Sequence, residues 1–192
     1  MKNKKQLIMN AAMSLIEKNG IAGLTVSDIA NEAKIGKGTV YEYFKCKEDI
    51  FYEAMEYGLE LCVKDLEKKA LANHPDHRKA VYNFIDSAVE IIKSQVFLSF
   101  STDSKICGFD KDSFEKLRNT VQKHYVTILG ICEKINQIGI EEGATKKPSY
   151  PLTHFIFSNM IFSTVMQSVN GTIQIGIDLK PYLYEMTVKL YS

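Results

Sequence analysis

The spacing of hydrophobic residues predicts helices through most of the chain. One stripe, with apolar side chains three or four positions apart, covers residues 7–16 and stops before Gly20. Around residues 99–112 the periodicity weakens, which predicts a short helix and a loop. Similar stripes predict five further helices, over residues 47–70, 76–94, 114–135, 151–170 and 178–191. Prolines are few, and Met, Leu, Ile, Ala, Glu and Lys are plentiful, so the stripes and the composition together predict an all-α fold.

Two short helices separated by a tight turn are predicted after the first stripe. Thr25 and Asp28 have the spacing of a capping box, which predicts a helix start at this point. Residues 34–36 are too few for anything but a turn, and Val40 and Phe44 then share one face of the next helix. A helix, a short turn and a second helix form a helix-turn-helix, whose second helix can enter the major groove of DNA.

Composition agrees with a folded helical protein. The chain has 192 residues, of which 45% are hydrophobic and 24% charged, with only four prolines. These fractions are ordinary for soluble globular proteins, and the length suits one large domain or two smaller ones. The segment "LTHFIFSNMIFSTVMQSV" approaches the length of a membrane span, but polar residues interrupt it, so we interpret it as a buried helix.

Charge and cysteine content narrow the function classes. Residues 1–47 carry eight lysines against four acids, a balance of +4, whereas the remainder of the chain is at −3. A basic segment of this kind indicates either a polyanion-binding surface or a solvated lysine face. The four cysteines are scattered, without metal-ligand or disulfide spacing, and the N-terminus lacks a signal-peptide pattern. We therefore expect free thiols, no metal or cofactor, and a cytoplasmic protein.

The stretch "LTVSDIANEAKIGKGTVYEYFKCKEDIF", from Leu24 to Phe51, resembles the signature of TetR-family transcriptional regulators. The resemblance implies an N-terminal three-helix helix-turn-helix domain over residues 1–46. A connecting helix would join it to a helical effector-binding and dimerisation domain over residues 47–192. It also implies double-stranded operator DNA and a small-molecule effector as partners, and a homodimer formed through the last two helices.

The family pattern assigns roles to single residues of the motif. It implies that Thr25 caps the second helix and contacts a phosphate. The residues implied to face bases are Ser27, Lys37, Gly38 and Thr39, and those implied to grip the DNA backbone are Tyr41, Tyr43 and Lys47. Glu42 departs from this pattern because it can repel phosphate, and Cys46 replaces the Ser or Asn usual at the next helix start.

The resemblance also implies an effector pocket within residues 76–145. Aromatic and histidine side chains in or near that region are candidates for lining it, although aromatic residues at helical spacing are more often plain core. The candidates are Phe97, Phe100, Phe109, His124, Tyr125, His154 and Phe157. Their character predicts a repressor released by a largely apolar or aromatic ligand. Independently of the resemblance, the helix over 151–170 is apolar nearly all round, which favours dimerisation.

Other functions fit the sequence less well. The chain lacks Ser/His/Asp, Glu-x-x-His and Gly-rich phosphate signatures, so we expect no enzyme. A helical protein-interaction domain without DNA contact, whose basic segment binds an acidic partner, remains an alternative. So does a redox-responsive regulator, because a helix N-terminus and two flanking lysines are expected to lower the pKa of the Cys46 thiol. His74 and His77 have a spacing that a metal could use, but beside Pro75 they are better interpreted as a helix start.

Overall fold

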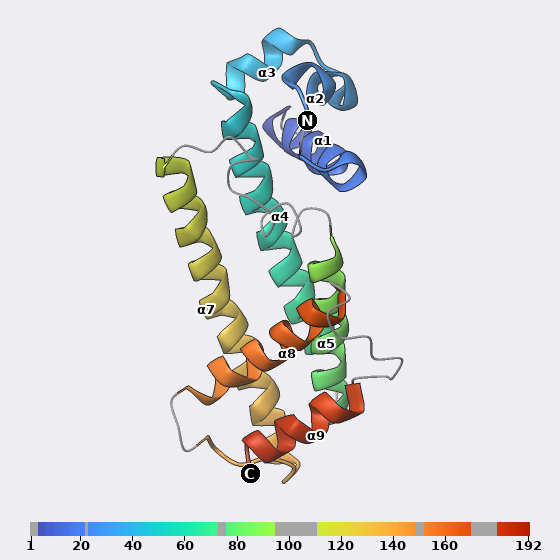
Figure 1. The fold of residues 1–192 in the computed structure, drawn as a ribbon, viewed down its shortest axis with the longest axis vertical. Helices are drawn as coiled ribbons and strands as arrows, with labels where there is room; N and C mark the ends of the chain where they lie inside the picture. Colours follow the sequence, from blue (N-terminus) through green and yellow to red (C-terminus); the bar gives the residue numbers. More distant parts are fainter. Residues whose placement is uncertain (1–3, 22, 73–75, 95–110, 149–151, 170–179) are drawn as a thin grey trace. The chain divides into compact units, whose positions relative to one another are not determined.

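The computed structural model describes residues 4–21, 23–72, 76–94, 111–148, 152–169 and 180–192. Within these ranges it contains eight helices and no strand (Figure 1). The helices are α1 (Lys4–Asn19), α2 (Val26–Ala33), α3 (Lys37–Tyr43), α4 (Lys47–Ala70), α5 (His77–Lys93), α7 (Lys111–Glu141), α8 (Thr153–Val169) and α9 (Lys180–Leu190). The all-α fold class predicted from the sequence is confirmed.

The predicted helix positions agree closely with these bounds. The connecting helix was expected over residues 47–70 and is found at those residues as α4. The long helix α7 is longer at both ends than the stripe over 114–135, because its first turn and its last six residues have few apolar positions. The short helix and loop expected around 99–112 fall mostly outside the described residues.

Two compact units share the chain. The first comprises Met1–Leu61 and Ser94–Gln122, and the second Cys62–Lys93 and Lys123–Ser192. Helices α4 and α7 each continue from one unit into the other. The chain therefore has two separate cores.

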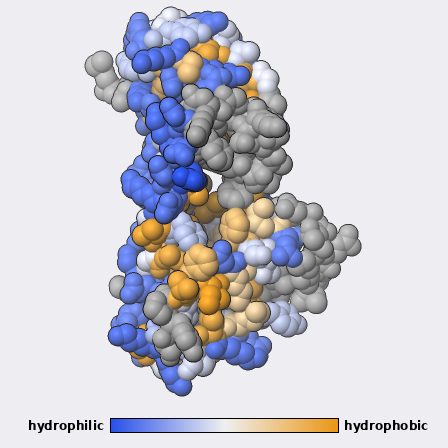
Figure 2. All heavy atoms as spheres, turned by 60° about the vertical axis from the view of Figure 1, so that its left-hand side comes forward, coloured by the Kyte–Doolittle hydropathy of each residue, from blue (hydrophilic) through white to orange (hydrophobic). Residues whose placement is uncertain are grey.

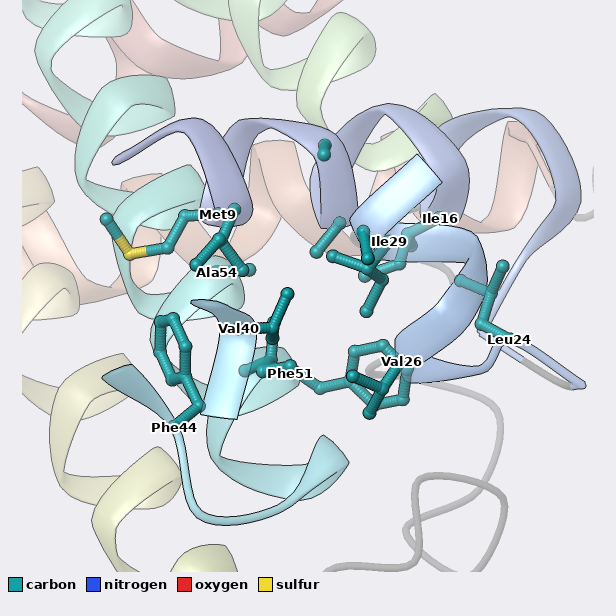
Figure 3. Packing of buried hydrophobic residues seen from close by; sticks show 14 of the residues in the cluster. Met9, Ile16, Leu24, Val26, Ile29, Val40, Phe44, Phe51 and Ala54 are labelled. Carbon is teal, nitrogen blue, oxygen red and sulfur yellow. The ribbon is translucent and has the colours of Figure 1, made fainter. Parts of the chain in front are cut away.

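The core of the first unit lies among α1, α2, α3 and the first turns of α4 (Figure 3). Ile8, Ala12 and Ile29 are fully buried there, and Val40 anchors α3 with no exposed surface. Phe51 of α4 is 1% exposed and lies close to Val40 in the same cluster. Burying a side chain of this size contributes about 1.5–3 kcal/mol, so these contacts fix α3 on the bundle.

Polar contacts join the same helices at their surface. Glu32 of α2 accepts hydrogen bonds from Ser14 Oγ at 2.9 Å and from Lys18 Nζ at 3.2 Å, both on α1. The Ser14 bond, followed by the Lys18 bond, lowers the pKa of this exposed carboxyl. Because an exposed ion pair stabilises little, the hydrophobic cluster provides most of the attachment.

The second unit packs α5, α8 and α9 against one another. Phe157 of α8 stacks on Phe84 of α5, with ring centroids 5.6 Å apart, and meets the Tyr191 ring edge-on at 5.9 Å. Tyr191 follows the end of α9, and its carbonyl accepts the Lys146 N–H at 2.8 Å. The end of the chain is thereby tied to the segment that follows α7.

Helix α8 is only partly covered by the rest of the chain. Phe157, Ile161 and Val165 are buried, as expected, but Phe155, Ile156 and Phe162 are 46%, 49% and 43% exposed. Among the described residues, no helix is long and apolar enough to cross a membrane.

Candidate nucleic-acid interface

The start of α2 is fixed by a reciprocal cap. Thr25 has extended backbone angles, and its Oγ1 accepts the Asp28 N–H at 3.2 Å. The Asp28 carboxylate accepts the Thr25 N–H at 2.9 Å and the Thr25 hydroxyl at 2.6 Å, and these bonds lower the pKa of Asp28. The capping role predicted for Thr25 is confirmed. Because its hydroxyl and its N–H are both already donated to Asp28, a phosphate contact of Thr25 would have to break one of these bonds.

The turn between α2 and α3 depends on one residue in the left-handed region. Lys34 has φ 56° and ψ 43°, and its N–H bonds to the Ala30 and Asn31 carbonyls. The Ile35 N–H returns to the Ala30 carbonyl at 3.0 Å. This arrangement satisfies carbonyl groups at the end of α2 and reverses the chain within three residues. Lys34 is exposed, although the motif gave no reason to select it.

The two glycines at the start of α3 face open space. A Cβ built on Gly36 or Gly38 would meet no heavy atom of the described residues within 4 Å. Both backbone φ values lie outside the left-handed region. Neither internal packing nor backbone strain therefore requires glycine at these positions.

Helix α3 carries most of the residues predicted to read DNA. Lys37 and Gly38 are exposed, and Tyr41 and Tyr43 are 51% and 41% exposed. Thr39 is half-buried in the same helix, and Ser27 is half-buried in the first turn of α2. Of the residues predicted to contact DNA, those on α3 are therefore exposed or half-buried within one seven-residue helix, while Ser27 lies on α2.

Lys47 lies apart from this group, at the first position of α4. It is half-buried, and its Nζ stands 5.6 Å from the centroid of the buried Phe51 ring. An ammonium group over a ring face is attracted by the π electrons. The side chain therefore has an intramolecular position from which it would have to swing to grip a phosphate.

The expectation that the pKa of the Cys46 thiol is lowered is wrong. The pKa of its thiol is raised, chiefly by partial desolvation, and the Asp49 and Glu48 side chains raise it further. A hydrogen bond with the Asp49 backbone acts in the opposite direction but is outweighed. The sequence argument counted the two flanking lysines and the helix dipole but neglected the carboxylates in the first turn of α4. The physical premise of the redox alternative is therefore removed.

The candidate effector residues divide into three groups. Phe97, Phe100 and Phe109 lie outside the described residues. His154 and Phe157 come together around Tyr191, whose hydroxyl lies 2.7 Å from His154 Nδ1. Phe157 is a core residue at 1% exposed, and burial lowers the pKa of His154 against the opposing charge of Glu133.

The third group surrounds Tyr125 of α7. Its hydroxyl lies 3.0 Å from Ser158 Oγ and accepts a hydrogen bond from Asn159 Nδ2, and Phe155 packs edge-on against its ring. His124, the preceding residue, is buried. The sequence reasoning missed Ser158, Asn159 and Tyr191, because isolated polar residues in apolar helices do not reveal their partners.

No metal centre is found in the part of the chain that the structure describes. No group of three or more His, Cys, Asp or Glu side chains comes together there. His77 is the first residue of α5, as the helix-start interpretation predicted, and His74 is outside the described residues.

The sequence and this arrangement of helices define the class of protein. Residues 8–54 match the family described as "Bacterial regulatory proteins, tetR family". The chain is also 30% identical over 171 residues to the fatty acid metabolism regulator protein of Bacillus subtilis (strain 168), covering 86% of this chain and 81% of that protein. The chain belongs to the TetR family and is a DNA-binding transcriptional regulator.

Solved structures support the same fold. The transcriptional regulator FadR from Bacillus subtilis, in complex with stearoyl-CoA, aligns over 97% of this chain and 99% of its own, with TM-score 0.66 and 21% identity. The fatty acid degradation regulator FadR from Bacillus halodurans aligns over 98% and 96%, with TM-score 0.67 and 18% identity. At these identities the likeness concerns the fold.

Proposed function

We propose that this protein is a homodimeric repressor that binds operator DNA through α3 and is released by a long-chain fatty acyl thioester. Residues 1–46 are the DNA-binding domain in this proposal, and residues 47–192 bind the effector and form the dimer. The DNA-binding part of the proposal depends on the exposed residues of α3, which lies within the region that matches the family. The buried side chain of Val40 attaches this helix to the core. Such a protein acts in the cytoplasm, where its operator lies.

The open glycines support close approach of α3 to DNA. Since no intramolecular contact uses the space beside Gly36 and Gly38, that space is free for another molecule. Lys37 lies between them and can reach acceptors on base edges, whereas Tyr41 and Tyr43 present hydroxyls to phosphates. Thr39 and Ser27 would add shorter polar contacts, and Lys47 would leave Phe51 to grip the backbone. Thr25 would contact phosphate only by releasing one of its two hydrogen bonds to the Asp28 carboxylate, because its N–H and its hydroxyl are both donated there.

The exposed apolar face of α8 and α9 supports the homodimer. In addition to Phe155, Ile156 and Phe162, Tyr182 and Met186 of α9 are 56% and 51% exposed. Figure 2 shows a group of hydrophobic residues at the surface of the second unit. Large exposed apolar groups on neighbouring helices are typical of interaction sites, and a second copy offers the same surface in return.

The effector is proposed from the relatives together with the character of the chain. A regulator of similar sequence is named for fatty acid metabolism, and one of similar fold was solved with stearoyl-CoA. The candidate pocket residues are mostly aromatic, which suits an acyl chain. Helix α4 begins three residues after α3 and continues into the second unit, so an effector that favours one tilt of α4 can change the spacing of the two α3 helices. Half-sites lie about 34–36 Å apart, so a small tilt weakens both contacts together.

Footprinting of the purified protein on DNA upstream of its own gene tests the DNA-binding part. Lys37→Ala is expected to relax discrimination at particular base pairs, and Lys189→Ala on the last turn of α9 is the matched control. If Lys37→Ala protects the same site as the parent with the same base-pair preference, Lys37 does not take part in base recognition. The absence of any protected site at low salt would instead favour the protein-interaction alternative.

Sedimentation of the free protein tests the dimer. Ile156→Asp is expected to produce monomers, whereas Leu61→Asp, at an exposed apolar position of α4, is expected to stay dimeric. Dimers that persist in Ile156→Asp would place the interface elsewhere.

Titration of the DNA complex with stearoyl-CoA tests the effector, with coenzyme A and stearate as separate controls. Release by the thioester, together with a higher melting temperature of the free protein, is expected. A rise in melting temperature without release would refute the coupling.

A further inference from the structure

The strongest unexplained feature outside the DNA-binding surface is the buried side chain of His77. This first residue of α5 has no exposed surface, and neither ring nitrogen has a hydrogen-bond partner among the described residues. Its backbone N–H donates to Glu142 Oε2 at 3.1 Å. A buried polar ring without a partner loses its hydrogen bonds to water and gains no protein hydrogen bond to compensate, so its position needs an explanation.

Three segments of the second unit enclose the ring. Gly139 of α7 approaches so closely that a Cβ added there would lie 2.9 Å from His77 Cδ2. Thr145, in the segment after α7, lies against the same position. The ring of Tyr184 on α9 lies 5.5 Å away, between centroids, at a tilt of 54°. His77 is therefore the point where the start of α5 meets α7 and α9.

The charged groups around the His77 ring do not offset the cost of its burial. The Arg78 guanidinium already lies 4.8 Å from the centroid of the Tyr184 ring. The two nearby carboxylates are engaged elsewhere: Asp76 accepts the Lys79 N–H and pairs with its ammonium, and Glu142 accepts the His77 N–H. Both carboxylates still attract a proton on His77, but burial outweighs them and lowers the pKa of the ring.

We propose that His77 is an acid-sensitive latch, whose neutral ring holds the start of α5 against α7 and α9 and whose protonation releases it. The direction follows from linkage. The unfolded chain takes up a proton near pH 6.5, whereas the folded chain resists it, so stability is complete above that pH and falls as pH decreases below it. Each pH unit in this window raises the unfolding equilibrium constant by up to tenfold, until the folded ring is also protonated.

The latch gives the protein a response to acidification that is separate from its effector. Because α9 also carries Tyr182 and Met186 of the proposed dimer face, release at Tyr184 acts on the helix that the dimer needs. Acidification would then weaken the second unit without any change in the residues of α3.

Urea unfolding of the full-length protein at pH 5.5, 6.0, 6.5, 7.0 and 8.0 tests this proposal. The parent is expected to lose stability below about pH 6.5, with up to one extra proton on unfolding from His77 and a further contribution from His154, whose pKa burial also lowers. His77→Gln, which cannot titrate, should lose that part of the slope, and His124→Gln, at another buried histidine, should keep it. An unchanged slope in His77→Gln, or an equal loss in His124→Gln, would overturn the proposal.

A second measurement applies if His77→Gln fails to fold. In the parent labelled at histidine Cε1, the His77 signal, assigned through its contact with the Tyr184 ring, should stay at the neutral position as the pH falls from 7.5 to 6.0. Titration of that signal near pH 6.5 in the folded protein would refute the latch.

Discussion

Replacing Gly139 by alanine is expected to destabilise the second unit, although alanine is the better helix former. At a helix position with open space around it, replacing glycine by alanine raises the free energy of unfolding by about 1 kcal/mol. At Gly139 the new Cβ would meet Thr145 Oγ1 closer than van der Waals contact allows, and His77 Cδ2 at 2.9 Å. Neither neighbour moves freely, because Thr145 Oγ1 donates to the Asn136 carbonyl at 3.2 Å and the His77 ring is fully buried.

Overpacking of a filled site costs about 1–3 kcal/mol, and two fixed neighbours place this case at the upper end. After subtraction of the helix gain, Gly139→Ala is expected to lower the free energy of unfolding by about 2 kcal/mol. Gly130 supplies a matched control on the same helix, since a Cβ there meets nothing within 4 Å. Gly130→Ala is therefore expected to stabilise by about 1 kcal/mol.

Urea unfolding followed by circular dichroism, at one fixed protein concentration, measures both variants. The double variant Gly139→Ala with Thr145→Ala should recover part of the loss, because it removes the nearer clash. Equal stability of Gly139→Ala and Gly130→Ala would show that the α7–α5 contact is looser than the structure indicates and that the added Cβ meets no clash.

Three further outcomes follow from single contacts. Thr25→Ala should cost about 1 kcal/mol of stability and Thr25→Ser only a few tenths, as thermal unfolding will show, because serine keeps the capping hydroxyl; equal losses would exclude the cap as the cause. Tyr191→Phe should cost about 1 kcal/mol in the same assay through the lost bond with His154 Nδ1, and no loss would mean that water replaces it. Since the pKa of Cys46 is raised, parent and Cys46→Ser should resist peroxide equally in a gel-shift assay, and a selective loss of DNA binding by the parent would restore the redox alternative.

Much of the first unit could be predicted from local sequence, because its signals act over a few residues. The Thr25 cap, the turn at residues 34–36 and the start of α4 at Lys47 each depend on neighbours within one helical turn. Burial of Val40 and Phe44 follows from the same periodicity. Lys37, Tyr41 and Tyr43 are exposed, since Val40 is the residue of α3 that is buried in the core.

Cys46 shows where local reasoning from charge fails even for nearby residues. Two lysines flank the thiol in sequence, yet Glu48 and Asp49 and partial desolvation determine its pKa. Sequence order does not state which flexible side chains reach a given atom. Lys47 illustrates the same limit, since its ammonium lies over the Phe51 ring.

The sequence by itself determined the all-α class, the helix-turn-helix and the apolar character of α8, because each depends on periodicity and short-range caps. Tertiary structure alone decided which apolar residues of α8 remain exposed and which partners the buried polar groups obtain. His77 meets Gly139 and Tyr184, and Tyr191 meets His154, across separations of 37 to 107 positions in the chain. Contacts of that kind depend on how whole helices pack against one another, and no local pattern of residues encodes them.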